Sequence, residues 1–228
     1  MIDIHSHILP GVDDGSASVE ESLEMLRLSR QQGVTLVFAT PHFSAVREAP
    51  ATFLARRQAA AAQLKLDPET MPQLRLGAEV AYFGGMSRCQ ELKELCLEGT
   101  SLLLLEMPFA PWTDRMIEEV CTIRQQLGLL PVLAHTERYA RSSQMGRYRD
   151  RLLQETLFQS NAEYFLHLRT KRKALRQLRD GQIHMLGSDA HNMSSRSPKL
   201  GVAAGIIRQK LGEAFLEELD EPILKYKR

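Results

Sequence analysis

The chain opens with Met1-Ile-Asp-Ile-His-Ser-His-Ile-Leu-Pro-Gly-Val-Asp-Asp-Gly-Ser16. Apolar and polar residues alternate as far as His7, which is typical of a strand, and the following Pro and Gly indicate a turn. Because residues two apart in a strand point to the same side, His5 and His7 can direct both imidazole rings at one point where this strand ends. Imidazole pairs of this kind suit zinc, manganese or iron. A single His-x-His motif is common, so the metal hypothesis needs support from the other strands.

Strands and helices alternate along the rest of the chain, which predicts an α/β fold. After the opening strand, apolar composition predicts strands over residues 34–39, 74–80, 101–106, 131–135, 163–167 and 183–187. Helices are expected between Ser18 and Gly33, over residues 52–64, 86–97, 114–127, 147–158 and 171–179, and once or twice near the C-terminus. This alternation implies a parallel sheet built of right-handed crossovers. Seven such units favour a closed barrel over an open sheet, although periodicity alone does not distinguish the two.

Length and composition suit one globular domain of 228 residues. The hydrophobic fraction of 43% and the charged fraction of 25% are ordinary for soluble proteins. A net charge of +1 predicts neither nucleic-acid nor membrane binding. No apolar run reaches the roughly 18 residues that a membrane span needs, and the first residues lack the pattern of a signal peptide. We therefore expect a cytoplasmic protein without membrane insertion.

Residues that could bind metals end most of the predicted strands. In parallel α/β folds, functional side chains gather at the carboxyl ends of strands. Glu106 follows four leucines, where an unpaired carboxylate would be costly to bury, so either a salt bridge or a metal must compensate its charge. His135 ends an apolar strand and suits either a metal site or a hydrogen-bonded place in the core. Nine potential ligands lie at or near strand ends or in the first loop: His5, His7, Asp14, His42, Glu79, Glu106, His135, Asp189 and His191.

Other side chains have simpler interpretations. Asp13 is expected to form the turn by bonding its own backbone. His167 is expected in the core or beside the ligands, and His184 inside the last strand is expected to be structural. Three cysteines lack the spacing of a zinc site or a disulfide framework and are expected to be inert: Cys89, Cys96 and Cys121. Five basic residues with helical spacing predict a solvated helix face or, alternatively, a surface for an acidic partner: Lys171, Arg172, Lys173, Arg176 and Arg179.

Seven motifs, taken in the order of the chain, carry a resemblance to a known family. They are Asp3-Ile-His-Ser-His7, Val12-Asp-Asp-Gly-Ser16, Ala39-Thr-Pro-His42, Gly77-Ala-Glu79, Glu106-Met-Pro108, His135-Thr-Glu-Arg-Tyr139 and Ser188-Asp-Ala-His-Asn192. The chain resembles the polymerase-and-histidinol-phosphatase (PHP) superfamily of metallo-phosphoesterases. Within it, the chain is most similar to the manganese-dependent tyrosine phosphatases of bacterial capsule and exopolysaccharide loci, the CpsB/CapC type. The resemblance implies a distorted seven-stranded β/α barrel, with residues 1–228 forming a single domain.

The same resemblance implies three divalent metal ions, with manganese expected and iron or zinc as alternatives. The first metal would be held by His5, His7, Glu79 and Asp189. Glu79 would bridge to the second metal, which Glu106 and His135 complete, and the third would be held by Asp14, His42 and His191. Arg138 and Arg196 correspond to arginines that bind the phosphoryl group, and Asp189 or His42 could donate a proton. Two departures are Phe43, where the family often has a second His, and residues 160–173, which match poorly.

The implied activity is hydrolysis of phosphotyrosine in proteins by a metal-bound hydroxide, which metal binding makes available near neutral pH. By the same resemblance, the substrate would be the tail of a tyrosine autokinase of polysaccharide export. Histidinol phosphate or another small phosphomonoester is the alternative substrate. Nucleic-acid ends are disfavoured because the near-neutral chain has no obvious basic, aromatic-lined groove. A regulatory module that binds metal on a retired catalytic site is the alternative from a different class.

Overall fold

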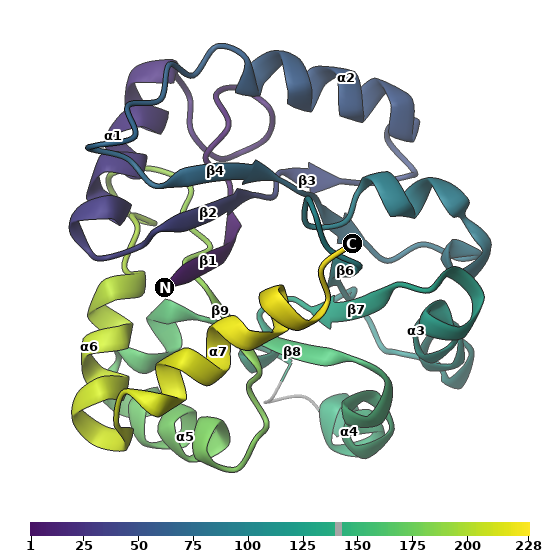
Figure 1. The fold of residues 1–228 in the computed structure, drawn as a ribbon. Helices are drawn as coiled ribbons and strands as arrows, with labels where there is room; N and C mark the ends of the chain where they lie inside the picture. Colours follow the sequence, from purple (N-terminus) through teal and green to yellow (C-terminus); the bar gives the residue numbers. More distant parts are fainter. Residues whose placement is uncertain (140–142) are drawn as a thin grey trace.

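Two curled parallel sheets form the centre of the fold (Figure 1). The structure is a computed structural model, and it describes residues 1–139 and 143–228. In this part of the chain, one sheet has the strand order β1-β2-β4 and the other has the order β3-β5-β6-β7-β8-β9. The strands are β1 (Ile2–Ser6), β2 (Leu36–Ala39), β3 (His42–Phe43), β4 (Gln73–Leu76), β5 (Glu79–Ala81), β6 (Leu102–Glu106), β7 (Leu130–Leu133), β8 (Leu157–Asn161) and β9 (Met185–Gly187).

The two sheets are connected where the strands end. The Asp189 N–H donates to the His5 carbonyl oxygen over 2.8 Å, which joins the segment after β9 to β1. On the other side, Pro41 separates β2 from β3, and because proline has no N–H it cannot continue the strand pairing. Its carbonyl oxygen still accepts from the Glu79 N–H over 3.1 Å. The parallel α/β prediction is confirmed, but the described strands form two hydrogen-bonded sheets rather than the one seven-stranded sheet expected.

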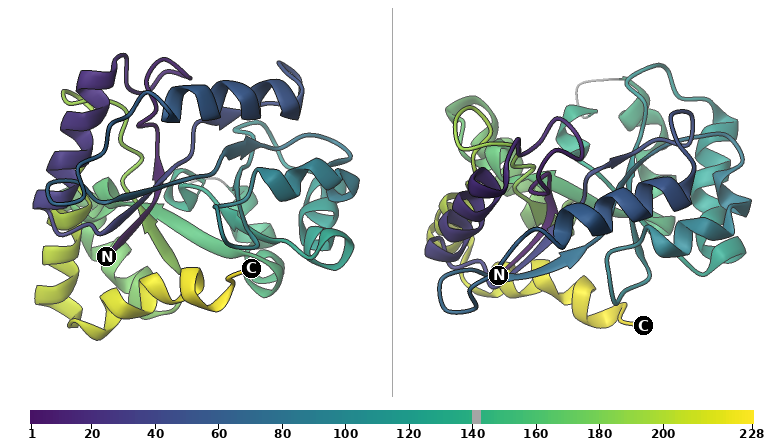
Figure 2. Two further views of the ribbon diagram at one scale, coloured as in Figure 1. Left: turned by 45° about the horizontal axis from the view of Figure 1, so that its top comes forward. Right: turned by 90° about the horizontal axis from the view of Figure 1, so that it is seen from above.

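Seven α-helices of the described chain surround the sheets (Figure 2). They are α1 (Val19–Gln31), α2 (Pro50–Ala61), α3 (Asp114–Leu127), α4 (Ser143–Glu155), α5 (Leu168–Arg179), α6 (Leu200–Leu211) and α7 (Ala214–Lys225). Local chemistry explains the ends of α3, because the Thr113 side chain accepts from the Met116 N–H and Gly128 follows with φ of 70°. The predicted bounds of this helix are confirmed. None of the helices in the described ranges combines the length and apolar character that crossing a membrane requires.

Two predicted elements have the wrong type, and the strand predicted over residues 74–80 is divided between β4 and β5, which belong to different sheets. Residues 86–97 form two short 3-10 helices, η1 (Met86–Arg88) and η2 (Gln90–Glu94), because Cys89 between them is extended. The expected strand over 163–167 is a 3-10 helix, η4 (Ala162–Phe165), and the real strand, β8, precedes it. The polar residues at the end of β8 are buried beside the site described below, so they obscured its strand character in the sequence.

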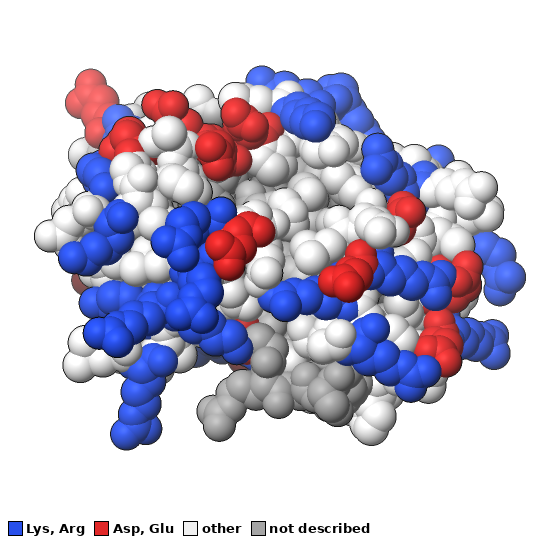
Figure 3. All heavy atoms as spheres, turned by 90° about the horizontal axis from the view of Figure 1, so that it is seen from below, with Lys and Arg blue, Asp and Glu red and all other residues white. Residues whose placement is uncertain are grey.

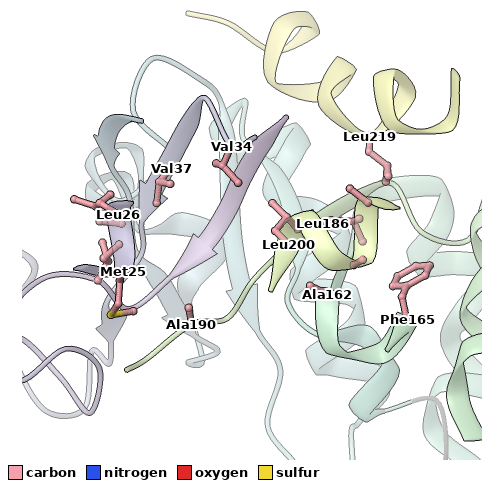
Figure 4. Packing of buried hydrophobic residues seen from close by; sticks show 14 of the residues in the cluster. Met25, Leu26, Val34, Val37, Ala162, Phe165, Leu186, Ala190, Leu200 and Leu219 are labelled. Atoms are coloured by element: carbon pink, nitrogen blue, oxygen red, sulfur yellow. The ribbon is translucent and has the colours of Figure 1, made fainter. Parts of the chain in front are cut away.

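Apolar side chains fill both sides of the sheets. Between the sheets, Ile4, Phe38, Leu104 and Met185 come from four different strands and pack in one buried cluster. Ile223 of α7 joins this cluster, so α7 covers the amino ends of the strands (Figures 1 and 2). A second cluster packs the sheets against the helices (Figure 4), and it includes Met25, Leu26, Val37, Phe165, Leu186, Leu200 and Leu219. With one end of the strands covered by α7, the carboxyl ends are left for a site.

The basic segment predicted over residues 171–179 is the exposed face of α5. Arg172, Lys173, Arg176 and Arg179 are exposed, whereas Ala174 and Leu178 of the same helix are buried. Lys and Arg side chains gather on the face of the molecule shown in Figure 3, where α5 lies. This confirms a solvated basic helix face and does not test the acidic partner.

Candidate metal centre

All nine predicted ligands meet at the carboxyl ends of the strands. Each of them lies in a strand or within eight residues after the end of one. This is where functional side chains gather in parallel α/β folds. Glu106 is the last residue of β6, whereas His42 and Glu79 are the first residues of β3 and β5, just beyond the carboxyl ends of β2 and β4. Of the remaining six, His5 lies near the end of β1. The other five follow β1, β7 or β9: His7, Asp14, His135, Asp189 and His191.

The first group centres on the two histidines of the opening motif. Nε2 of His5 lies 3.1 Å from Nε2 of His7, so the period of the strand directs both rings to one point as predicted. The Glu79 Oε2 atom lies 3.3 Å from each of these nitrogens, and the Asp189 Oδ1 atom lies 3.6 Å from each. Two imidazole nitrogens and two carboxylate oxygens therefore converge on one small volume.

A second group lies on the other side of Glu79. The second oxygen of this carboxylate, Oε1, is 2.9 Å from Nε2 of His135. Glu106 Oε1 lies 3.2 Å from the same nitrogen. Each oxygen of Glu79 thus faces a different set of imidazole rings, which is the arrangement of a carboxylate that can bridge two cations.

The third group lies nearer the surface. Asp14 Oδ1 is 3.4 Å from Nε2 of His42 and 3.7 Å from Nε2 of His191. Ligand atoms of these three residues and of His7 all lie within 4.8 Å of one another. His42 also reaches the middle of the site, because its Nδ1 is 3.0 Å from Glu79 Oε2. The three groups are therefore contiguous.

Asp13 has a larger part than the turn predicted for it. It does form the turn, since its Oδ1 accepts from the Gly15 N–H over 3.0 Å. Its Oδ2, however, lies 2.7 Å from Nδ1 of His7 and accepts from the His42 N–H over 2.9 Å. Burial alone would raise the pKa of Asp13, but the hydrogen bond from His7 outweighs it and holds that pKa well below its usual range. A carboxylate behind a histidine orients the ring and fixes which nitrogen faces the metal.

Sequence reasoning missed Gln159, a fully buried residue of β8. Its Oε1 accepts from the His135 N–H over 2.7 Å and lies 3.2 Å from Nδ1 of His5. Its Nε2 donates to Asn161 Oδ1 over 2.9 Å, and Asn161 Nδ2 donates to Asp189 Oδ2 over 2.7 Å. The signal that could have found these residues is a Gln-Ser-Asn segment at the place where the sixth strand was needed.

The two arginines predicted to bind a phosphoryl group both contact Asp189. Arg196 Nη2 is 2.8 Å from Asp189 Oδ2, and Arg138 Nη2 donates to the same oxygen. Both side chains are partly exposed, so they can also reach a group that arrives from solvent. Burial would raise the pKa of Asp189, but His5 and the two arginines keep it well below its usual range. Asp189 is therefore ionised at neutral pH.

Backbone strain coincides with two of the ligands. In the described chain, the non-glycine residues with positive φ are His135 at 34° and Asp189 at 52°. This left-handed region is unfavourable for residues with a Cβ atom, and such strain concentrates at functional sites. The packed strand ends hold both side chains in a direction that an extended backbone would not give them.

The donor set fits divalent cations. His191 Nε2 is buried and, among the described residues, has no hydrogen-bond partner, although it faces Asp14 and His42. A buried polar atom without a partner is uncommon and is explained if the atom binds a metal. Burial lowers the pKa of His5, but Glu79 and Asp189 outweigh it and raise that pKa to about 9. The carboxylates thus demand positive charge, which divalent cations would supply in place of protons.

A cleft of about 810 Å³ leads to the centre. Asp14, His42 and Glu106 line it together with Arg47 and Arg56. A substrate can therefore reach the ligands from the surface at the carboxyl ends of the strands.

The remaining predicted residues lie outside the centre. Phe43 is buried and its ring packs 5.2 Å from that of Phe53, so this departure from the family pattern belongs to the core. His184 is structural as predicted, because its Nδ1 accepts from the Phe158 N–H over 3.0 Å. The prediction for His167 is wrong, because this residue is exposed just before α5. Its Nε2 atom lies 3.5 Å from Glu163 Oε1.

The cysteines show no sign of reactivity. Cys96 and Cys121 are buried and Cys89 is partly buried, and all three are free thiols. Burial raises the pKa of Cys96 to about 11 and also raises that of Cys121. Neither thiol is a nucleophile at neutral pH, which agrees with the prediction that they are inert.

Known proteins share both the sequence and the fold. A family model described as capsular polysaccharide synthesis, CpsB/CapC, matches residues 1–221. The tyrosine-protein phosphatase CpsB of Streptococcus agalactiae is 31% identical over 231 residues, which cover 96% of this chain and 94% of that protein. The tyrosine-protein phosphatase YwqE of Bacillus subtilis is 29% identical over 229 residues, covering 97% and 89% of the two chains.

Solved structures agree with this. One solved structure superposes on this chain with a TM-score of 0.80. It comes from a study of YwqE from Bacillus subtilis and CpsB from Streptococcus pneumoniae, which are described there as unique metal-dependent tyrosine phosphatases. It is 26% identical and covers 97% of this chain and 92% of that one. A dihydropyrimidinase from Brevibacillus agri shares the fold, with a TM-score of 0.60 at 10% identity over 96% of this chain and 68% of its own.

Proposed function

The chain belongs to the CpsB/CapC family of capsular polysaccharide synthesis, and on that premise we propose that it is a metal-dependent tyrosine-protein phosphatase. The relatives named as tyrosine-protein phosphatases match nearly their whole length, so the activity is carried by the part of the chain that is shared. The observation that supports the proposal most is the position of Glu79. Its two oxygens face the His5–His7 pair and His135, so one buried carboxylate links the groups of ligands.

Three divalent ions would be held by the nine ligands. His5, His7, Glu79 and Asp189 would bind the first, Glu79, Glu106 and His135 the second, and Asp14, His42 and His191 the third. Mixed imidazole and carboxylate donors suit manganese, with iron or zinc as alternatives. When bound, such ions act as Lewis acids and make an ionised water available near neutral pH.

The protein's own residues would bind and orient the phosphoryl group. Arg138 and Arg196 both contact Asp189, and their planar guanidinium groups match the oxygens of a phosphate in geometry and charge. Of the two proton donors considered, Asp189 is unsuitable because its low pKa keeps it ionised. His42 would be a ligand of the third metal beside Asp14, and an imidazole nitrogen that binds a metal carries no proton to donate, so neither residue suits this role in the metal-loaded site. A phenol leaves readily and needs little of this help.

The physiological setting forms part of the proposal. The substrate would be the phosphorylated tail of a tyrosine autokinase of polysaccharide export, and the enzyme would act in the cytoplasm. Residues 1–228 would form one domain, with the two sheets acting together as a distorted barrel around the inner apolar cluster. The hydrogen bond between Asp189 and His5, which connects the sheets, supports this.

Turnover of two phosphate esters tests the proposal. We expect the manganese-loaded protein to hydrolyse a phosphotyrosine peptide with a higher kcat/KM than histidinol phosphate. EDTA should abolish turnover, and His135→Ala should lower it at least about 100-fold because it removes a ligand. His167→Ala, which changes an exposed histidine outside the centre, is the matched control and should leave turnover unchanged. Activity that survives both EDTA and His135→Ala would refute the metal mechanism.

A further inference from the structure

Phe109 is an exposed aromatic residue beside the metal centre. It follows β6 by three positions, and 66% of its surface is exposed. Among the described residues, the other Phe, Tyr and Trp side chains are buried or partly buried. The Phe109 ring is largely exposed at the rim of a polar site, where it adds little to the core and can contact a ligand.

The loop that carries Phe109 is held on both sides of this residue. The Tyr139 hydroxyl donates to the Met107 carbonyl oxygen over 2.5 Å, and Trp112 Nε1 donates to the Pro108 carbonyl oxygen over 2.8 Å. Tyr139 and Trp112 are themselves buried, with ring centroids 5.1 Å apart. The Phe109 ring rests against Tyr139 at 5.5 Å. Its backbone is therefore fixed before any substrate binds, which reduces the entropy lost on binding.

The ring also has a defined relation to the ligands. It lies parallel to the His135 ring, with an interplanar angle of 10° and centroids 6.3 Å apart. His135 faces Glu79 and Glu106 through Nε2, so Phe109 stands directly beside the second group of ligands. The leaving group of a substrate whose phosphoryl group binds there would lie within reach of the Phe109 ring.

We infer that Phe109 contacts the phenyl ring of phosphotyrosine and selects aryl over alkyl phosphate esters, an inference that rests on the proposed function. In phosphotyrosine a single ester oxygen joins the phosphorus to the aromatic ring, so the ring must lie close to the centre. Offset or edge-to-face packing on Phe109 would be favourable for a phenyl ring and largely lost for a serine or threonine side chain. Phe109 is thus a specificity residue, and it takes no part in the chemical step.

Binding of two phosphonates tests this without turnover. Calorimetry with the manganese-loaded protein would compare phenylphosphonate with methylphosphonate, which share the anionic group and differ in the ring. For Phe109→Ala we expect phenylphosphonate to bind about five- to tenfold more weakly and methylphosphonate to bind unchanged. The affinity of Phe109→Leu for phenylphosphonate should lie between those of Phe109→Ala and the wild type. Leu168→Ala, which truncates a residue 88% exposed on α5, is the matched control and should change neither affinity.

Kinetics provide the second measurement. For a phosphotyrosine peptide, Phe109→Ala should raise KM with little change in kcat, because the contact is made equally in the ground state and the transition state. A phosphoserine peptide should show no such rise. If Phe109→Ala weakened the binding of both phosphonates equally, the change would be a structural effect on the centre, and the inference would be overturned. If it weakened the binding of neither, Phe109 would make no contact with the ring, and the inference would be overturned as well. If the wild-type protein binds neither phosphonate, the proposed function itself fails, and that outcome is distinct.

Discussion

Replacing Gly187 by alanine tests whether the junction between β9 and β1 positions the metal ligands. A Cβ atom at this position would lie 2.4 Å from His5 Cβ and 3.0 Å from Gln159 Nε2. Carbon atoms in contact are normally about 3.5–4.0 Å apart, so His5 would have to move by about 1 Å. The movement would displace its Nε2 from the point that it shares with His7, 3.1 Å away.

Two quantities should change. Overpacking of this kind costs about 1–3 kcal/mol of stability. Misplacing one ligand should also weaken manganese binding by about 10–100-fold, or roughly 1.4–2.7 kcal/mol. Urea unfolding in EDTA would measure the first quantity, and competition with a chelating dye would measure the second.

The chain contains a matched control. Gly205 lies exposed in α6, and a Cβ atom there would have no neighbour within 4 Å. Gly205→Ala should therefore keep the metal affinity and raise the free energy of unfolding by up to about 1 kcal/mol, because alanine favours a helix over glycine. The reasoning would be refuted if Gly187→Ala bound manganese as tightly as the wild type and unfolded at the same urea concentration.

Three further predictions concern two residues that support the ligands and the titration of His5. Asp13→Asn should weaken manganese binding about 10–100-fold in a metal titration of activity, with excess metal restoring turnover, because His7 loses its carboxylate; unchanged affinity would contradict this. Gln159→Leu should cost about 1–3 kcal/mol in urea unfolding in EDTA, because it leaves the His5 ring without its buried partner; a neutral effect would refute the role assigned to Gln159. In EDTA, the melting temperature should fall between pH 6.5 and about 9. The folded protein raises the pKa of His5 from 6.5 to about 9. The stability that the protonated His5 ring contributes is therefore complete below pH 6.5 and is lost as the pH rises through about 9. A melting temperature that rises over this range would contradict the prediction.

The sequence predicted the elements whose causes lie within a few residues. The bounds of α3 follow from Thr113 and Gly128, which cap it locally. The convergence of His5 and His7 follows from the two-residue period of a strand. The nine candidate ligands could be selected because polar residues that end apolar strands are hard to explain as packing. These inferences needed no knowledge of which segments meet.

The tertiary structure decided what depends on distant neighbours. Gln159 and His5 are separated by 154 positions, so no local pattern could show that a buried amide in β8 supports the first group of ligands. For the same reason β8 was misplaced, since its polar residues are favourable in a strand only because their partners lie in the segments that follow β7 and β9. Asp13 was predicted to form a turn, and only the packing of β3 beside it adds the His42 backbone N–H as a further partner. Residue types and strand period are properties of short segments, whereas the sharing of Glu79 among the ligands exists only once the strand ends are brought together.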